Sequence, residues 1–123
     1  MLKSVLFIFL GGGFGAVVRF LIAKFSSQFF ESNFPLGTFV SNLIASVVLG
    51  LLVYQFNLRL DASQKTLYLF LVIGFCGGLS TFSTFSIETF ELLKQGNFAF
   101  ALVNIVISIG AGLGALAMLY KQQ

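Results

Sequence analysis

The stretch GFCGGLSTFSTFSIETF, residues 74–90, is as apolar as a membrane-spanning helix but carries glycines and hydroxyl side chains at its centre. Gly77 and Gly78 weaken a helix locally. Where a helix is interrupted inside a membrane, backbone carbonyl oxygens lose their helical partners and must face protein, water or an ion. We therefore predict that this helix is broken near Gly77 and Gly78, and that the freed oxygens form a cation site.

The composition of the whole chain is that of an integral membrane protein. Of 123 residues, 58% are hydrophobic and 9% are charged, with a mean hydropathy of +1.01, whereas about 25% of residues are charged in ordinary soluble domains. Four apolar stretches approach the roughly 20 residues that cross a bilayer as a helix. They are residues 5–25, 34–56, 66–87 and 97–120.

The connections between these stretches are short, at residues 26–33, 57–65 and 91–96. Helices are the only structure such isolated apolar runs can adopt in lipid. We predict an all-α membrane protein with four transmembrane helices, forming a single domain over residues 1–123. Its expected location is the plasma or inner membrane, as a multi-pass protein.

Positive charges are spread thinly and form no cluster, so a nucleic-acid partner is not expected. The basic residues expected on the side of the two termini are Lys3, Arg59, Lys65 and Lys121. Lys24 and Lys94 fall on the other side, joined by Arg19 if its side chain reaches that way. A margin of four against two or three is too small for the positive-inside rule to fix orientation, and both topologies are allowed.

Enzymatic chemistry is not expected. The chain has no histidine and a single cysteine, Cys76, so the commonest proton shuttle and imidazole-based metal sites are missing. No pair of carboxylates lies within an apolar stretch, which leaves no set of acid and base groups. We predict that there are no catalytic residues.

Each helix carries small or polar residues four apart, a spacing that places them on one face. These residues are Gly11, Gly15 and Arg19; Thr38, Asn42, Ser46 and Gly50; Asn104, Ser108 and Gly112, with Gly110 and Gly114 as a neighbouring pair. For the glycines and Ser46 we favour close helix packing. Asn42 is interpreted as functional, because an amide within the membrane needs several partners. Arg19 either has a functional role or extends to the interface, and we slightly favour the structural role.

The third stretch combines aromatic and hydroxyl groups. Phe82 and Phe85 are three residues apart, and Ser80, Thr84 and Glu88 form an adjoining stripe. Phenyl rings have positive edges, and together with hydroxyl protons they could replace the water around a small anion without holding it too tightly. Packing alone would explain the phenylalanine pair, but its conjunction with the glycines and Asn42 favours a pore or a transporter site.

Four motifs together resemble the Fluc, or CrcB, family of small microbial fluoride channels. They are GGGFGAVVR at 11–19, GTFVSN at 37–42, GGLSTFSTF at 77–85 and NIVISIGAGLGA at 104–115. Members of that family are homodimers of two oppositely oriented subunits. They have two fluoride pathways along the subunit interface and a structural sodium ion at the centre. The resemblance implies the same dual-topology homodimer here, with fluoride and sodium ions and the lipid bilayer as its partners.

Individual residues match the family by position. The resemblance implies that the backbone carbonyls of Gly77 and Ser80 bind sodium, that Phe82 and Phe85 line the fluoride pathway, and that Asn42 lies beside them. It assigns Ser83, Thr84, Asn104 and Ser108 to the polar part of that pathway, and Arg19 and Glu88 to a vestibule or a structural role. Ser80 replaces the usual threonine, and Ala45 replaces a glycine three residues after the asparagine.

The function implied by this resemblance is passive, fluoride-selective export from the cell. Two alternatives stay open. A small multidrug-resistance-type exporter also has four short helices, but that family needs an acidic residue in its first helix, and residues 5–25 contain none. A non-transporting membrane subunit would explain the small-residue faces but not the convergence of Asn42 with the hydroxyl stripe.

Overall fold

Four long helical spans make up the chain in the computed structural model, which describes residues 1–120. The spans cover Leu2–Phe29, Leu36–Gln55, Lys65–Lys94 and Phe98–Tyr120, and each is long and apolar enough to cross a membrane. No strand occurs within these 120 residues. The prediction of an all-α protein with four membrane-length helices is confirmed. Lys121, which was counted among the charges near the termini, lies outside the described residues.

Two of the spans are continuous α-helices and two are composite. The continuous ones are α1 (Leu2–Phe29) and α6 (Phe98–Tyr120). The second span is α2 (Leu36–Gly50) followed by the π-helical η1 (Leu51–Gln55). The third consists of α3 (Lys65–Tyr68), π-helical η2 (Leu69–Cys76), α4 (Gly77–Leu79) and α5 (Phe82–Lys94). The hydrophobic pattern does not distinguish the wider π-helical turns from α-helix.

Two helices extend beyond their predicted ends. The first continues through Phe29, so residues 26–29 are helical and not part of a connection as predicted. Nothing in this stretch stops a helix, since no glycine or proline occurs between Gly15 and Pro35. The third span likewise continues through residues 91–94, where a connection was predicted, and ends before Gly96. Gly96 has a φ of 76°, a left-handed conformation that glycine adopts without strain and that ends many helices.

The third span is interrupted close to Gly77 and Gly78, but not at the glycines themselves. Both glycines are helical, and the interruption predicted near them lies at the second and third residues after Gly78. The extended residues follow directly: Ser80 has φ −81° and ψ 155°, and Thr81 has φ −153° and ψ 116°. The reason is that Gly78 packs backbone to backbone against α1, where a Cβ atom would overlap the Gly12 carbonyl oxygen.

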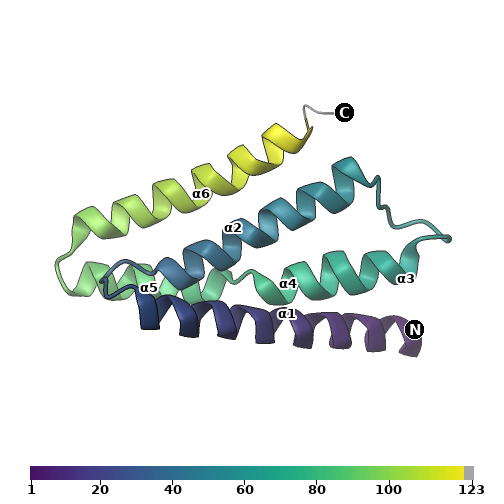
Figure 1. Ribbon diagram of the computed structural model, residues 1–123, viewed down its shortest axis with the longest axis horizontal. Coiled ribbons are helices and arrows are strands. Elements are labelled where there is room, and N and C mark those ends of the chain that lie inside the picture. The colour runs from purple at the N-terminus through teal and green to yellow at the C-terminus, as the bar shows by residue number, and fades with distance from the viewer. Residues whose placement is uncertain (121–123) are drawn as a thin grey trace.

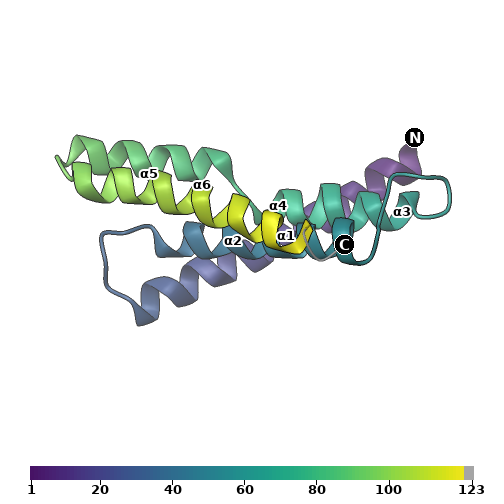
Figure 2. The same cartoon turned by 90° about the horizontal axis from the view of Figure 1, so that it is seen from above.

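The spans lie along a common long axis (Figure 1). The first half of the third span, η2 and α4, packs on α1, whereas its second half, α5, packs on α6. α2 contacts both α1 and α6. Figure 2 shows the resulting offset, with α5 beside α6 and α4 beside α1. The chain therefore changes its packing partner at the two extended residues.

Glycines form the contact between α1 and the first half of the third span. Gly11 and Gly15 are buried, and a Cβ atom on either would overlap a backbone oxygen, of Phe70 and Phe75 respectively. Gly74 closes the same contact, since a Cβ there would lie 2.9 Å from the Gly11 Cα. Small residues let membrane helices approach to backbone contact. The packing role predicted for Gly11 and Gly15 is confirmed.

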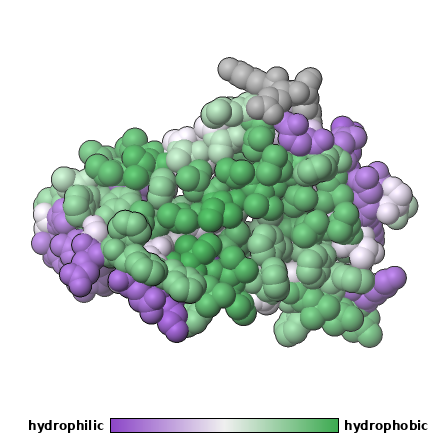
Figure 3. Space-filling model, viewed as in Figure 1, coloured by the Kyte–Doolittle hydropathy of each residue, from purple (hydrophilic) through white to green (hydrophobic). Residues whose placement is uncertain are grey.

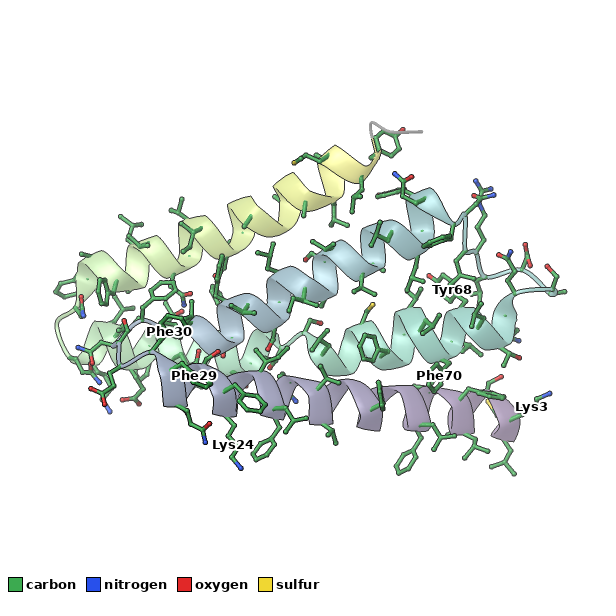
Figure 4. All side chains as sticks on the ribbon, in the orientation of Figure 1. Lys3, Lys24, Phe29, Phe30, Tyr68 and Phe70 are labelled. Atoms are coloured by element: carbon green, nitrogen blue, oxygen red, sulfur yellow. The ribbon has the colours of Figure 1, made fainter. Side chains whose placement is uncertain are left out.

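The surface is consistent with a membrane environment. In Figure 3 hydrophobic side chains fill a broad central band, and hydrophilic residues gather toward its two ends. Lys3 and Lys24 lie toward opposite ends of α1 (Figure 4). Polar residues are instead buried inside, with Ser41 at 0% and Asn104 at 1% exposure. Apolar outside and polar inside is the arrangement expected where lipid is the solvent.

Candidate functional site

Asn42 of α2 holds the extended residues of the third span. Its Oδ1 accepts a hydrogen bond from the Thr81 N–H at 2.7 Å, and its Nδ2 donates to the Thr81 carbonyl at 3.3 Å. The side-chain amide thus satisfies both backbone groups of one residue, as a neighbouring strand would. In a membrane these groups could not be left unpaired without a large cost. Asn42 therefore makes the extended conformation tolerable at this depth.

Thr81 in turn starts α5. Its Oγ1 accepts from the Thr84 N–H at 3.2 Å, the standard arrangement of an N-cap residue. These bonds have a consequence for the preceding turn. In a continuous helix the N–H groups of Thr81 and Thr84 would bond to the carbonyls of Gly77 and Ser80. Because both N–H groups donate elsewhere, those two carbonyl oxygens are released from their helical partners.

A groove of about 300 Å³ runs beside the extended residues. Phe82 and Phe85 line it with ring centroids 6.0 Å apart at an interplanar angle of 37°. The polar lining comes from Asn42, Ser46, Ser80, Thr81 and Ser108, with Ile109 completing the wall. None of these lining residues is ionisable. Phe82 is 80% exposed in the single chain, so the groove is open on that side.

Behind the groove, hydrogen bonds connect Ser108 to α5. Ser108 Oγ donates to Asn104 Oδ1 at 3.1 Å, and Asn104 Nδ2 donates to Thr89 Oγ1 at 2.9 Å. Thr89 then donates to the Phe85 carbonyl at 2.7 Å. Asn104 is thus buried and does not line the groove itself, but through these hydrogen bonds it fixes the position of Ser108 relative to Phe85.

A second space lies on the other side of Thr81, among residues of α1, α2 and α5. This cavity of about 250 Å³ has a mainly apolar lining that includes Ala16, Phe20 and Ala23. Its polar lining residues are Arg19, Thr38, Ser41, Thr84 and Glu88, and Thr81 lines both the cavity and the groove. Thr38 Oγ1 donates to Glu88 Oε1 at 2.9 Å. Three buried polar atoms have no partner within residues 1–120, and all three belong to residues of this cavity: Arg19 Nε, Ser41 Oγ and Glu88 Oε2. We call it the Arg19 cavity.

The structure therefore separates the predicted site residues into groups. Phe82, Phe85, Asn42 and Ser108 are brought together in the groove. Thr84 joins Arg19 and Glu88 in the Arg19 cavity. Ser83 is exposed beside Thr81, with their hydroxyl oxygens 3.3 Å apart, and lines neither space. Gly77 and Ser80 supply the released carbonyls.

Sequence reasoning missed four polar residues of these two spaces. Ser46 lines the groove, but was interpreted as a packing residue. Thr81 is the cap and the partner of Asn42, and a hydroxyl residue three positions before another, in STFST, could have indicated a helix start. Thr38 shares the four-residue spacing of Asn42 and Ser46. Nothing in the sequence distinguishes Ser41.

A resident small cation fits the chemistry of the released carbonyls. Oxygen ligands suit hard cations, and Gly77 leaves its surroundings open, with no heavy atom within 4 Å of a Cβ built on it. No group of three or more His, Cys, Asp or Glu side chains that could hold a metal ion occurs in the described part of the chain. The released backbone oxygens of Gly77 and Ser80 are donors of the kind that such a cation prefers.

Four membrane-length helices, with a polar and aromatic groove beside the third span, define a multi-pass integral protein of the cell membrane. A profile described as CrcB-like protein, Camphor Resistance (CrcB), matches residues 6–120. The chain belongs to the CrcB, or Fluc, family.

Curated relatives cover nearly the whole chain. A protein of Citrifermentans bemidjiense is 41% identical over 112 residues, which is 91% of this chain and 90% of that protein. One from Pyrococcus abyssi is 44% identical over 108 residues, covering 88% and 85%. A third, from Azobacteroides pseudotrichonymphae, is 38% identical over 120 residues, covering 98% and 95%. Each of these proteins is named fluoride-specific ion channel FluC.

Proposed function

We propose that this protein is a fluoride-selective ion channel, and not an enzyme, that lets fluoride leave the cell down its electrochemical gradient. Membership of the family and the names of the relatives support fluoride as the ion. The observation that carries the proposal is the groove, where two phenyl rings face amide and hydroxyl groups and no lining residue is ionisable. An anion held there meets no fixed positive charge.

The chemistry of the groove suits a small anion that must shed water. Nδ2 of Asn42 carries two N–H groups, and one bonds to Thr81, which leaves the second for an anion. Ring edges of Phe82 and Phe85 carry partial positive charge. Conduction needs binding that is favourable enough to enter and weak enough to leave. Ser108 donates to Asn104, so its proton reaches an anion only when that bond gives way.

The active unit in this proposal is an antiparallel, dual-topology homodimer with two pores. The 80% exposure of Phe82 supports a second copy, because an open groove facing lipid would not conduct an ion. Gly77, Gly110 and Gly114 support it too, since no heavy atom lies within 4 Å of a Cβ built on any of them. Such bare positions permit close approach of another helix.

A structural sodium ion would lie at the centre of that dimer. The carbonyls of Gly77 and Ser80, released by Asn42 and Thr81, are the proposed ligands. Two oxygens from each of two subunits make four, a number compatible with a small hard cation. The cation would hold the subunits together and take no part in permeation.

The remaining polar residues have supporting roles in this proposal. Arg19 and Glu88 form a vestibule, together with Thr84. Glu88 lines two further cavities, of about 340 and 310 Å³, formed with residues of the connection between α1 and α2. This arrangement supports a polar approach from that end of the protein. Ser83 and Asn104 belong to the polar environment of the pathway, Asn104 by positioning Ser108.

Efflux from proteoliposomes tests the proposal. Purified protein is expected to release fluoride and to leave chloride inside. Phe82→Ile and Phe85→Ile are each expected to abolish fluoride efflux while the protein still folds and dimerises. Phe90→Ile, on the same helix but outside the groove, is the matched control and keeps its flux. Equal efflux of the two ions, or no efflux of either, would overturn the channel; unchanged flux in both Phe82 and Phe85 variants would return those rings to a packing role.

The sodium ion requires its own experiment. Exhaustive exchange of sodium for a large organic cation is expected to impair fluoride flux, because that cation cannot fit among carbonyl oxygens. A fluoride flux that does not change on this exchange would contradict the sodium site but would not contradict the proposed fluoride pathway.

A further inference from the structure

The Arg19 cavity contains two opposite charges that do not touch. Arg19 and Glu88 both line it, yet no ion pair within 4 Å joins them in the described part of the chain. Arg19 Nε is buried as a donor without an acceptor, and Glu88 Oε2 is buried as an acceptor without a donor. An unpaired charge inside a membrane carries a high free-energy cost, so each group needs a partner.

Ser41 supplies the third unpartnered polar atom of the Arg19 cavity. Its side chain is fully buried, and its Oγ has no hydrogen-bond partner within residues 1–120. Two other serines of the membrane spans behave differently: Ser46 donates to the Asn42 carbonyl at 3.0 Å, and Ser80 donates to the Cys76 carbonyl at 2.9 Å. Each of these two hydroxyls bonds to the carbonyl four residues earlier on its own helix. Ser41 does not, although the same type of bond is common for serine in a helix.

The hydrogen-bonding needs of Arg19 Nε, Ser41 Oγ and Glu88 Oε2 indicate which kind of molecule could bridge them. Arg19 Nε needs an acceptor, Glu88 Oε2 needs a donor, and a serine hydroxyl can be either. An anion would satisfy Arg19 but be repelled by an ionised Glu88, and a cation would have the reverse difficulty. A water molecule both accepts and donates. The cavity is large enough, at about 250 Å³, since a water occupies about 30 Å³ and needs 2–4 polar partners.

We propose that ordered water in the Arg19 cavity joins Arg19 to Glu88 as a water-bridged ion pair, and that Ser41 anchors this water. The bridge ties α1 to α5, and Thr38 holds the other oxygen of Glu88 from α2. Three helices thus share one buried network. Ser41 is a positioning residue here. The inference goes beyond the proposed function, because it holds whether or not fluoride passes through the groove.

Thermal unfolding of the purified protein in detergent tests the bridge through a double-mutant cycle. Arg19→Met and Glu88→Gln are each expected to lower the Tm, because each removes one end of the bridge and leaves the buried polar atom at the other end without its charged counterpart. The double variant is expected to lose less than the sum of the two shifts, since residues in one network are non-additive. In a Ser41→Ala background that non-additivity shrinks. In a Ser46→Ala background it is unchanged, because the Ser46 hydroxyl bonds to its own helix.

Two results of this cycle would overturn the proposal. Additive shifts for Arg19 and Glu88 would show that the two groups are not linked. Non-additivity that is equal with and without the Ser41 hydroxyl would show a link that does not involve Ser41. Loss of fluoride flux in any of these variants would bear on the proposed channel function. The water bridge is tested by the Tm values alone.

A crystal structure of the unaltered protein provides a second measurement if a variant fails to fold. At a resolution that places ordered water, density is expected within hydrogen-bonding distance of Arg19 Nε, Ser41 Oγ and Glu88 Oε2. A direct contact between Arg19 and Glu88, or a side chain of a second copy in the cavity, would contradict the bridge.

Discussion

The two halves of the third span are built from different chemistry. Before Ser80, η2 and α4 pack on α1 through glycines, and backbone meets backbone with no room for a side chain. After Thr81, α5 packs on α6 and presents phenyl and hydroxyl groups to a groove. The first half is fixed by shape and the second by hydrogen bonds. The comparison shows how one span can provide both a rigid anchor and a polar surface.

The largest effect is expected in the glycine contact. Gly11→Ala places a methyl group against the Phe70 carbonyl, where neither backbone can yield easily. Overpacking costs about 1–3 kcal/mol and sometimes more, which exceeds the gain of up to about 1 kcal/mol from replacing glycine by alanine in a helix. We expect a lower Tm and loss of monodisperse protein on gel filtration. Gly13→Ala on the same helix, where space is open, is the control and keeps or raises the Tm.

Removing the Asn42 amide tests the hydrogen-bonded half. Asn42→Ala leaves the N–H and carbonyl of Thr81 without partners. A buried unsatisfied group costs about 1–3 kcal/mol, and because the two bonds of Asn42 are only part-buried, we expect a cost toward the lower end of that range. Both the Tm and the rate of fluoride efflux are expected to fall. Ser46→Ala is the matched variant one turn away, and its Tm stays close to that of the unaltered protein. Equal Tm values for the two variants would refute the bridging role of Asn42.

A smaller effect is expected at the start of α5. Thr81→Ala removes the cap that accepts the Thr84 N–H, and losing such a cap costs about 1 kcal/mol. Thr81→Ser keeps an oxygen in the same place and is expected to restore most of the lost Tm. A failure of serine to rescue would mean that the threonine methyl group, and not the cap, stabilises this point.

The smallest effect concerns the loop before α3, which precedes the glycine-packed half. Asp61 Oδ1 accepts hydrogen bonds from the Ser63 hydroxyl and from the N–H groups of Ser63 and Gln64. The bond from the Ser63 side chain is the main cause that lowers the pKa of Asp61 below its ordinary value. A lowered folded-state pKa adds stability above the unfolded-state pKa and loses it as the pH falls through the folded-state pKa.

Asp61→Ala is therefore expected to lower the Tm slightly at neutral pH. The difference from the unaltered protein disappears in acid, once Asp61 is protonated in both states. Thermal melts across a pH series measure this. A difference that persists at the lowest pH would mean that Asp61 acts through something other than its charge. Asp61 is fully exposed, which is why the effect ranks last.

The sequence was sufficient for the four spans, and it named Asn42, Phe82, Phe85 and Ser108 but missed Thr81 and the place of Ser46 in the groove. Long apolar runs specify membrane helices. The three-residue spacing placed Phe82 and Phe85 on one helix face, and the family resemblance implied that Asn42 lies beside them. The position of the helix interruption was not predictable from glycine content, because Gly78 is committed to the contact with α1. Thr81 became extended through its bonds to Asn42, a residue 39 positions earlier in the chain.

The cavity around Ser41 shows the same limit. Serine is common at helix contacts in membranes, and nothing in its local sequence separates Ser41 from Ser46. Their difference arises only when three helices assemble and one hydroxyl finds a partner on its own helix while the other does not. Pairwise spacing on a single helix carries no such information.

The carbonyls freed at Gly77 and Ser80 have a consequence for mutagenesis. A main-chain oxygen survives every side-chain substitution, so an alanine scan of this protein would leave the proposed cation ligands in place and report them as neutral. For the same reason, a backbone ligand at position 80 would be present with either serine or threonine there. Only an edit to the main chain itself, such as an ester in place of an amide, would weaken these ligands directly.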